Sequence, residues 1–325
     1  MSGLLRIFAL SSLLFAVVAG GAPAFGQSVD VGGRMFVDYF YNVAGPDSAA
    51  SPGAREGMHG FRYRRLYLTS DFQLSDDFSG RARLEADENT RPFVKDLALT
   101  WNYTGAHSAT LGITPPPVFA VANGFWGYRA LDKTLVDLQD IADSRDFGLR
   151  FDGPLIGEET LQYAVMVANN SGIQAETNTQ KRVYGQLQTT LDSFTFVVGS
   201  DYAEYGDQRD YGTRFSVFGG YETGWGRIGV EGYWYRLAFE GAGERTDLGA
   251  SLFGVVEVAP SWELIARVDR SAERRVGADR YETFLLGGVS YRPHSNVLLI
   301  PNLRMRDLSS QEVETTGRFT VRVQF

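Results

Sequence analysis

The chain has 325 residues, no cysteine, 13% aromatic residues and a formal net charge of -8. The acidic charge argues against a nucleic acid partner, and the lack of cysteine excludes a small disulfide-stapled secreted domain. Mean hydropathy is -0.17. That value excludes a bundle of membrane-spanning helices, but it is compatible with membrane strands that alternate apolar and polar side chains.

The N-terminus has the pattern of a secretory signal peptide. A positively charged residue precedes the apolar run 7–19, and small residues follow this run. Since a spanning helix needs ~20 apolar residues, we favour a signal cleaved near Ala24 or Gly26 over a membrane anchor. Residues 1–26 are therefore predicted to be a signal peptide, and residues 27–325 are predicted to form one exported β-barrel domain.

The exported part divides into sixteen segments with strand-like composition or alternating polarity. They are 29–43, 61–74, 78–88, 94–104, 109–114, 146–153, 160–169, 181–191, 194–203, 211–222, 227–240, 246–258, 262–271, 281–292, 297–306 and 316–325. Short turns and long loops alternate between them, as in outer-membrane barrels whose turns and termini lie on the periplasmic side. The predicted fold class is all-β, a 16-stranded antiparallel transmembrane β-barrel.

The C-terminal segment shows the alternation most clearly. Phe319, Val321 and Phe325 share one face of a strand, whereas Arg318 and Arg322 share the other. An apolar face opposite an arginine-rich face suits a wall between lipid and water. The terminal Phe325 resembles the closing strand of bacterial outer-membrane β-barrels, and this resemblance implies that the barrel assembly machinery reads it as a signal.

Some positions resist assignment to the lipid face or the lumen face. Arg62 and Arg64 fall on the nominal lipid face, so either they lie above the membrane or a β-bulge reverses the alternation. The stretches 215–221 and 285–289 are ambiguous.

The longest loop, 115–145, is third among the predicted extracellular loops. Its first three residues are prolines, which end a strand by removing hydrogen-bond donors. A short helix is predicted over 131–141, with leucines along one stripe. Four acids lie off that stripe: Asp132, Asp137, Asp140 and Asp143. Asp132 has an alternative role, stabilising the N-terminus of the helix.

Loop 115–145 resembles the constriction loop of trimeric sixteen-stranded porins, which folds into the barrel. The following segment 144–153 is similar to the Arg-Asp-Leu-Gly segment of the phosphate-selective porin O and P family, with Phe147 in the Leu place. The resemblance implies a pore-folded third loop whose four acids face arginines of the barrel wall. Those wall arginines would be Arg34, Arg65, Arg81, Arg83 and Arg150.

By the same resemblance, the expected function is passive diffusion of ions and small polar solutes through a water-filled channel in the outer membrane. Opposed rows of charge would order water and favour polar solutes. The expected partners are outer-membrane lipid, lipopolysaccharide and two further copies in a homotrimer. The alternative is a substrate-selective channel for phosphate, another anion or a sugar. Acids on the lumen face, such as Glu85, argue against selectivity for phosphate. The aromatic residues Phe36, Phe40 and Tyr67 on the inferred inner face are compatible with a row of aromatic rings along which a sugar could pass.

An enzyme is the weakest interpretation of this sequence. His59 lies in a predicted loop, and His107 and His294 lie in predicted turns, so no histidine-based site can be built on a strand. The sequence has no metal-binding, phosphate-loop or dinucleotide motif, so no metal and no cofactor is expected. A soluble secreted β-protein is the remaining alternative.

Overall fold

The computed structural model describes residues 28–46, 53–157, 160–206, 210–239, 243–275, 278–309 and 312–325. The predicted signal peptide, 1–26, lies outside the described residues. Among the described residues, no helix is both long enough and apolar enough to cross a membrane.

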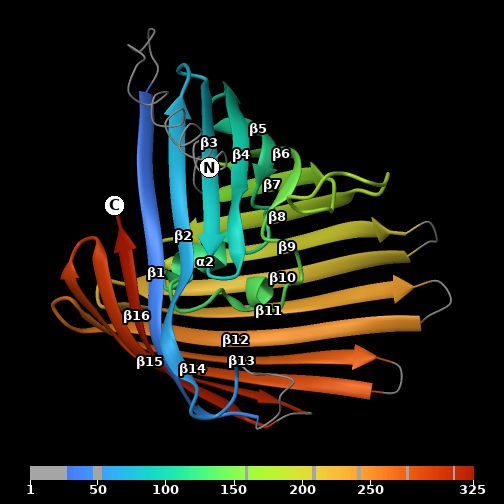
Figure 1. Ribbon diagram of the computed structural model, residues 1–325. Coiled ribbons are helices and arrows are strands. Elements are labelled where there is room, and N and C mark those ends of the chain that lie inside the picture. The colour runs from blue at the N-terminus through green and yellow to red at the C-terminus, as the bar shows by residue number, and fades with distance from the viewer. Residues whose placement is uncertain are drawn as a thin grey trace, which may run out of the picture.

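Sixteen antiparallel strands form a closed barrel in which β1 pairs with β16 (Figure 1). Their bounds are β1 Ser28–Ala44, β2 His59–Gln73, β3 Phe78–Asp87, β4 Thr90–Thr104, β5 His107–Thr114, β6 Asp146–Ile156, β7 Leu161–Ala168, β8 Arg182–Leu191, β9 Phe194–Tyr205, β10 Asp210–Thr223, β11 Gly226–Phe239, β12 Gly243–Ala259, β13 Trp262–Arg275, β14 Ala278–His294, β15 Val297–Leu308 and β16 Glu314–Gln324. Each predicted segment corresponds to one strand, so the predicted fold class is confirmed. Closure matters because it leaves no strand edge without a hydrogen-bonded partner.

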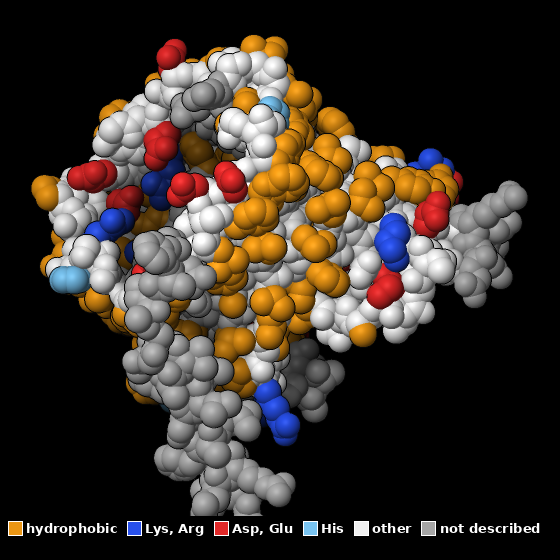
Figure 2. All heavy atoms as spheres, turned by 90° about the horizontal axis from the view of Figure 1, so that it is seen from above, with side chains coloured by type: hydrophobic (Ala, Val, Ile, Leu, Met, Phe, Trp, Pro, Cys, Tyr) orange, Lys and Arg blue, Asp and Glu red, His pale blue; other side chains and the backbone are white. Residues whose placement is uncertain are grey.

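The outer surface of the barrel is apolar, as the alternation predicts. About half of the residue surface is exposed at Leu97, Leu111 and Val230. By contrast, the chain neighbours of Leu97 and Val230, which are Asp96 and Glu231, are buried inside the barrel. Figure 2 shows apolar side chains spread over the outside, with charged groups around the hollow and at the opposite edge of the molecule. Aromatic residues stack beside short turns, with ring centroids 6.0 Å apart for Phe78–Trp101 and 4.4 Å for Trp262–Tyr291.

A charge placed on this outer surface should destabilise the barrel more than the same charge placed inside. We expect Leu97→Arg to cost about 2–4 kcal/mol, because Leu97 lies at the centre of β4 and its side chain would meet hydrocarbon. The adjacent Ala98 faces an internal cavity, so Ala98→Arg is the matched control and should cost less. Urea unfolding in lipid vesicles measures both variants, and equal costs would contradict the assignment of faces.

The two arginines that resisted assignment face the lumen because β2 contains a β-bulge. Phe36 pairs with Arg65 whereas Val37 pairs with Tyr63, so the register skips Arg64. Of the two explanations left open by the sequence, the bulge is the one that the structure contains.

The ambiguous stretches have apolar side chains on both faces of the wall. In β10, Phe218 is buried inside while Phe215 is exposed outside, and in β14 Leu286 and Leu285 are divided in the same way. The inner wall is therefore partly apolar in these strands. The alternation is lost here because this part of the inner wall is covered by another segment of the chain.

The connection between β5 and β6 contains two short helices, α2 (Ala120–Trp126) and α3 (Leu135–Leu138). The prediction of a single helix over 131–141 was therefore wrong in its bounds, and it missed α2. The Asn-Gly pair inside α2 has low helix propensity. Both helices are held by contacts with β11, and α3 also contacts β12.

Candidate functional site

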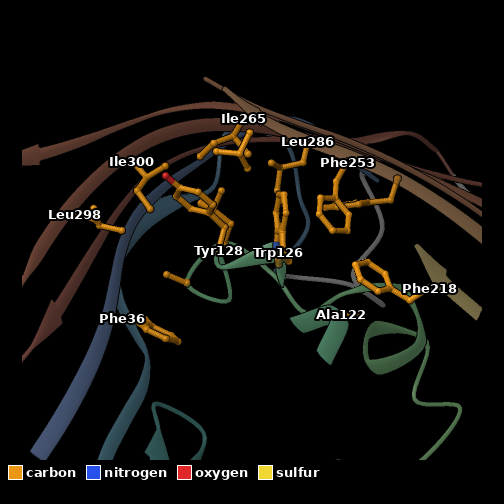
Figure 3. Close-up of a cluster of buried hydrophobic side chains, with 14 of the residues drawn as sticks. Phe36, Ala122, Trp126, Tyr128, Phe218, Phe253, Ile265, Leu286, Leu298 and Ile300 are labelled. Atoms are coloured by element: carbon orange, nitrogen blue, oxygen red, sulfur yellow. The ribbon is translucent and has the colours of Figure 1, made fainter. Parts of the chain in front are cut away.

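The segment 115–145, here called the inner segment, is fixed to the wall by a buried apolar cluster. Trp126 is fully buried, and its ring lies 4.9 Å from that of Phe253, centroid to centroid. Figure 3 shows Trp126 and Tyr128 of the inner segment pointing toward Ile265 and Leu286 of the wall. They belong to a hydrophobic core between the inner segment and β1, β9, β10 and β12 to β15.

A second buried cluster fixes the other end of the inner segment. Leu135, Val136 and Ile141 pack with Met166 of β7 and Tyr184 of β8, and all five are at most 4% exposed. Because burying a leucine-sized side chain contributes roughly 1.5–3 kcal/mol, the two clusters together hold the inner segment as a rigid part of the fold.

Wall arginines satisfy the backbone carbonyl groups of the inner segment, which have no strand partner. Each of six arginines donates to a different carbonyl: Arg150 to Pro115, Arg227 to Trp126, Arg64 to Ala130, Arg304 to Leu131, Arg267 to Lys133 and Arg182 to Ile141. The carboxylate of Glu231 accepts from the backbone N–H of Val136 at 3.3 Å. A buried carbonyl without a hydrogen-bond partner costs free energy. These arginines therefore stabilise the backbone of the inner segment against the wall.

Three adjoining cavities lie along the remaining part of the wall, from β1 to β8. The large cavity, about 570 Å³, is lined by β1 to β4, β16 and the inner segment. A middle cavity of about 300 Å³ shares Arg81, Arg83 and Arg145 with the large one. A third, of about 230 Å³, shares Arg150 and Asp152 with the middle one and reaches the turns at the end of the barrel. Together they outline an off-centre passage beside the inner segment.

The large cavity has an excess of positive charge. Its lining has six basic side chains, Arg34, Arg81, Arg83, Lys95, Arg129 and Arg145, and three acidic ones, Asp30, Asp71 and Asp137. Arg81 pairs with Asp71 at 2.6 Å, and Arg83 pairs with Asp96 at 3.1 Å. Arg34 and Arg129 form no ion pair within the described part of the chain, so their charges are available to a solute.

No family model and no curated protein matches the sequence. The structure is similar to that of OmpT, an outer-membrane protein of Vibrio cholerae, with a TM-score of 0.71 and 13% identity over 94% of this chain and 99% of that one. It is also similar to an anion-selective porin from Comamonas acidovorans, with a TM-score of 0.69 and 13% identity over 92% and 100% of the two chains. A third similar structure is that of the outer-membrane channel DcaP of Acinetobacter baumannii, with a TM-score of 0.69 and 12% identity over 94% of this chain and 100% of that one. The chain has a porin fold.

Within this porin fold, the four predicted loop acids occupy different environments. Asp132 pairs with Arg304 at 2.9 Å, Asp137 pairs with Lys133 at 2.9 Å, and Asp140 contacts the same lysine at 3.3 Å. Asp143 is exposed. Only Asp137 of the four lines the large cavity. The sequence analysis did not foresee that Lys133 contacts two of these acids.

The five predicted wall arginines are placed on the inside, but most pair with wall acids rather than with loop acids. Arg65 pairs with Glu85, and Arg150 pairs with Asp152 at 2.5 Å. Arg34, Arg81 and Arg83 line the large cavity together with Asp137. Asp132 pairs with Arg304, which was not among the predicted wall arginines.

The ion pair between Asp132 and Arg304 should resist acid. Burial favours the neutral form, but the guanidinium groups of Arg304, Arg267, Arg318 and Arg64 hold the pKa of Asp132 well below its ordinary value of 3.8. A depressed carboxyl pKa contributes stability that is lost only as the pH falls through the folded-state pKa. Asp132→Asn should therefore cost about 2–3 kcal/mol at both pH 7 and pH 4. Unfolding midpoints of both proteins measure this, and a cost that disappears by pH 4 would contradict it.

The histidines are strand-terminal residues rather than loop or turn residues, contrary to the sequence analysis. His59 begins β2, His107 begins β5 and His294 ends β14. His59 contacts Tyr39 and His107 contacts Tyr163, each at 3.2 Å. In the described part of the chain, no group of three His, Cys, Asp or Glu side chains could hold a metal ion.

The C-terminal Phe325 closes the barrel seam. Its backbone exchanges two hydrogen bonds with Gly33, of 2.7 and 3.0 Å. Its ring occupies the space over Gly33, where a side chain would collide with it. The ring is also 63% exposed on the outer face. Its role as an assembly signal stays a prediction.

Proposed function

We propose that this protein is an outer-membrane porin, through which ions and small polar solutes diffuse passively. The observation that carries the proposal is the series of adjoining cavities, with many charged lining residues, inside a barrel whose outer surface is apolar. A sixteen-stranded barrel is wide enough for an aqueous channel. The inner segment narrows this channel from one side, which makes it the candidate constriction loop.

The charges of the large cavity favour anions over cations. Two of its arginines, Arg34 and Arg129, have no carboxylate partner among the described residues, and the side chains of the lining carry an excess of three positive charges. A low-dielectric wall focuses such a field into the passage and raises the local anion concentration. The similarity to an anion-selective porin agrees with this preference.

Selectivity for phosphate has some support from the structure, whereas selectivity for a sugar has less. The segment similar to the phosphate-selective family supplies Arg145 and Arg150 to the cavities. Selectivity for a sugar is less favoured, because the rings of Phe36 and Phe40 are buried, at most 9% exposed. Of the three aromatic residues predicted to face the lumen, only Tyr67 lines the large cavity. We therefore propose a weakly selective anion channel rather than a phosphate- or sugar-specific one.

The expected partners are outer-membrane lipid and lipopolysaccharide on the outside of the barrel, and we propose a homotrimer. Small residues that alternate toward the outer face of β3, such as Gly80 and Ala86, could pack against a second barrel. They give this assembly little support, since the ring of Phe72 covers Gly80 and Ala86 is buried within the monomer. Crosslinking in native membranes tests the trimer.

Planar-bilayer recording tests the channel. The folded protein should give stepwise conductance, and in a potassium chloride gradient its reversal potential should have the sign of chloride preference. A silent bilayer would contradict the channel, whereas a cation-selective current would contradict the anion preference alone.

A further inference from the structure

Four arginines and two acids meet inside the barrel at a place separate from the large cavity. The residues are Arg62 and Arg64 of β2, Arg304 of β15, Arg318 of β16, Asp38 of β1 and Asp132 of the inner segment. None of the four arginines lines the large cavity. This group is called the arginine cluster below.

The carboxylate of Asp38 is fully occupied by its neighbours. It is 0% exposed, and it accepts from Arg64 and, at 2.8 Å, from the hydroxyl of Thr320. Arg62 reaches it at 3.5 Å and Arg318 at 4.0 Å. One carboxylate thus has three guanidinium groups around it. The two more distant ones, of Arg62 and Arg318, receive little electrostatic stabilisation from it.

Arg318 is the least satisfied member of the arginine cluster. Its side chain is 16% exposed, and within the described residues its guanidinium donates no hydrogen bond. The Nε–H groups of Arg318, Arg62 and Arg304 are all buried without a hydrogen-bond partner in the described part of the chain. Arg304 as a whole is 8% exposed.

The arginine cluster has four positive and two negative charges, and an arginine cannot lose its proton in a protein. Burying an uncompensated charge is far more costly than burying a paired one. Water could satisfy the free N–H groups, but it could not offset the two excess charges. An anion with several oxygen atoms would do both, because guanidinium groups bind such oxygens in pairs.

We propose that the arginine cluster binds a small oxyanion, held by Arg318 and its neighbours Arg62 and Arg304. The anion would be a resident part of the fold, because Arg64 and Arg304 also donate to the carbonyl groups of Ala130 and Leu131. It would link β2, β15 and β16 to the inner segment. The site does not depend on the channel function proposed above.

Thermal unfolding of the full-length folded barrel in nonionic detergent tests the site, with sulfate as the probe and chloride at equal ionic strength as the reference. Sulfate should raise the unfolding midpoint of the native protein in a saturable manner. Arg318→Gln should weaken the apparent sulfate affinity about 10- to 100-fold, because a hydrogen bond to a charged group contributes about 1.5–3 kcal/mol. Arg270→Gln is the matched control, since Arg270 is an exposed arginine that lines none of the three cavities.

A crystal of the native protein soaked in selenate provides a direct readout that does not need any variant to fold. An anomalous peak within hydrogen-bond distance of the Arg318 guanidinium would support the site. The proposal is overturned if no such peak forms, if sulfate leaves the native midpoint unchanged, or if Arg318→Gln and Arg270→Gln respond alike. A silent bilayer in the conductance experiment would leave these three results unaffected.

Discussion

Replacing Trp126 by alanine should release the inner segment from the wall and leave the barrel closed. Trp126 is the largest fully buried side chain among the described residues, and its indole Nε1–H donates to the carbonyl of Asp132 at 3.0 Å. The guanidinium of Arg267 lies 5.6 Å from the centre of its ring. Removing a buried tryptophan costs about 3–5 kcal/mol of stability. Most of this loss should weaken the packing of the inner segment against the wall. The strand ladder involves no atom of this side chain, so the barrel should survive.

Two measurements separate the loop from the barrel in this variant. Limited proteolysis should cleave Trp126→Ala within the inner segment, while heat-modifiable migration on a gel should still report a folded barrel. Its conductance should be larger and noisier than that of the native protein, because the constriction has lost its fixed position. Trp225→Ala is the matched control, since Trp225 is 65% exposed in a turn and contributes to neither cluster. Unchanged proteolysis and conductance would mean that the inner segment does not depend on this core.

The strands could be predicted from the sequence because lipid imposes a rule on every residue of the wall. Leu97 must face hydrocarbon and Asp96 must not, so the period of two remains visible along the chain. The closing pair follows the same rule, with Val37 opposite Val321 in the register of β1 and β16. Where the inner wall is covered by protein instead of water, as at Phe218 and Leu286, the rule no longer constrains both faces. The alternation is lost at those places.

The partners of the inner segment could not be predicted, because they depend on side chains far apart in the sequence. Arg81 and Arg267 both alternate with apolar neighbours, yet Arg81 pairs with Asp71 and lines the cavity, whereas Arg267 caps the carbonyl of Lys133. Only the position of each strand relative to the inner segment separates the two roles. The same limit explains why Arg304 was missed as the partner of Asp132, which lies 172 residues away.

Reversing the two free charges of the large cavity should reverse the ion preference of the channel. The double variant Arg34→Glu, Arg129→Glu changes an excess of three positive charges into a deficit of one, while the ion pairs of Arg81 and Arg83 remain. Because the wall focuses the field into the passage, the reversal potential in a salt gradient should change sign from chloride to potassium preference. The effect should shrink in molar salt, where the screening length falls to about 3 Å.

The matched control changes the same number of charges away from the passage. Arg236 and Arg270 line none of the three cavities. Arg236 pairs with Glu244, and Arg270 is exposed. The double variant Arg236→Glu, Arg270→Glu should keep chloride preference, with at most a small change in its magnitude. If both double variants shifted the reversal potential equally, selectivity would come from the overall charge of the protein. If neither did, solutes would follow a route that avoids Arg34 and Arg129, and the passage along β1 to β8 would not be the one in use.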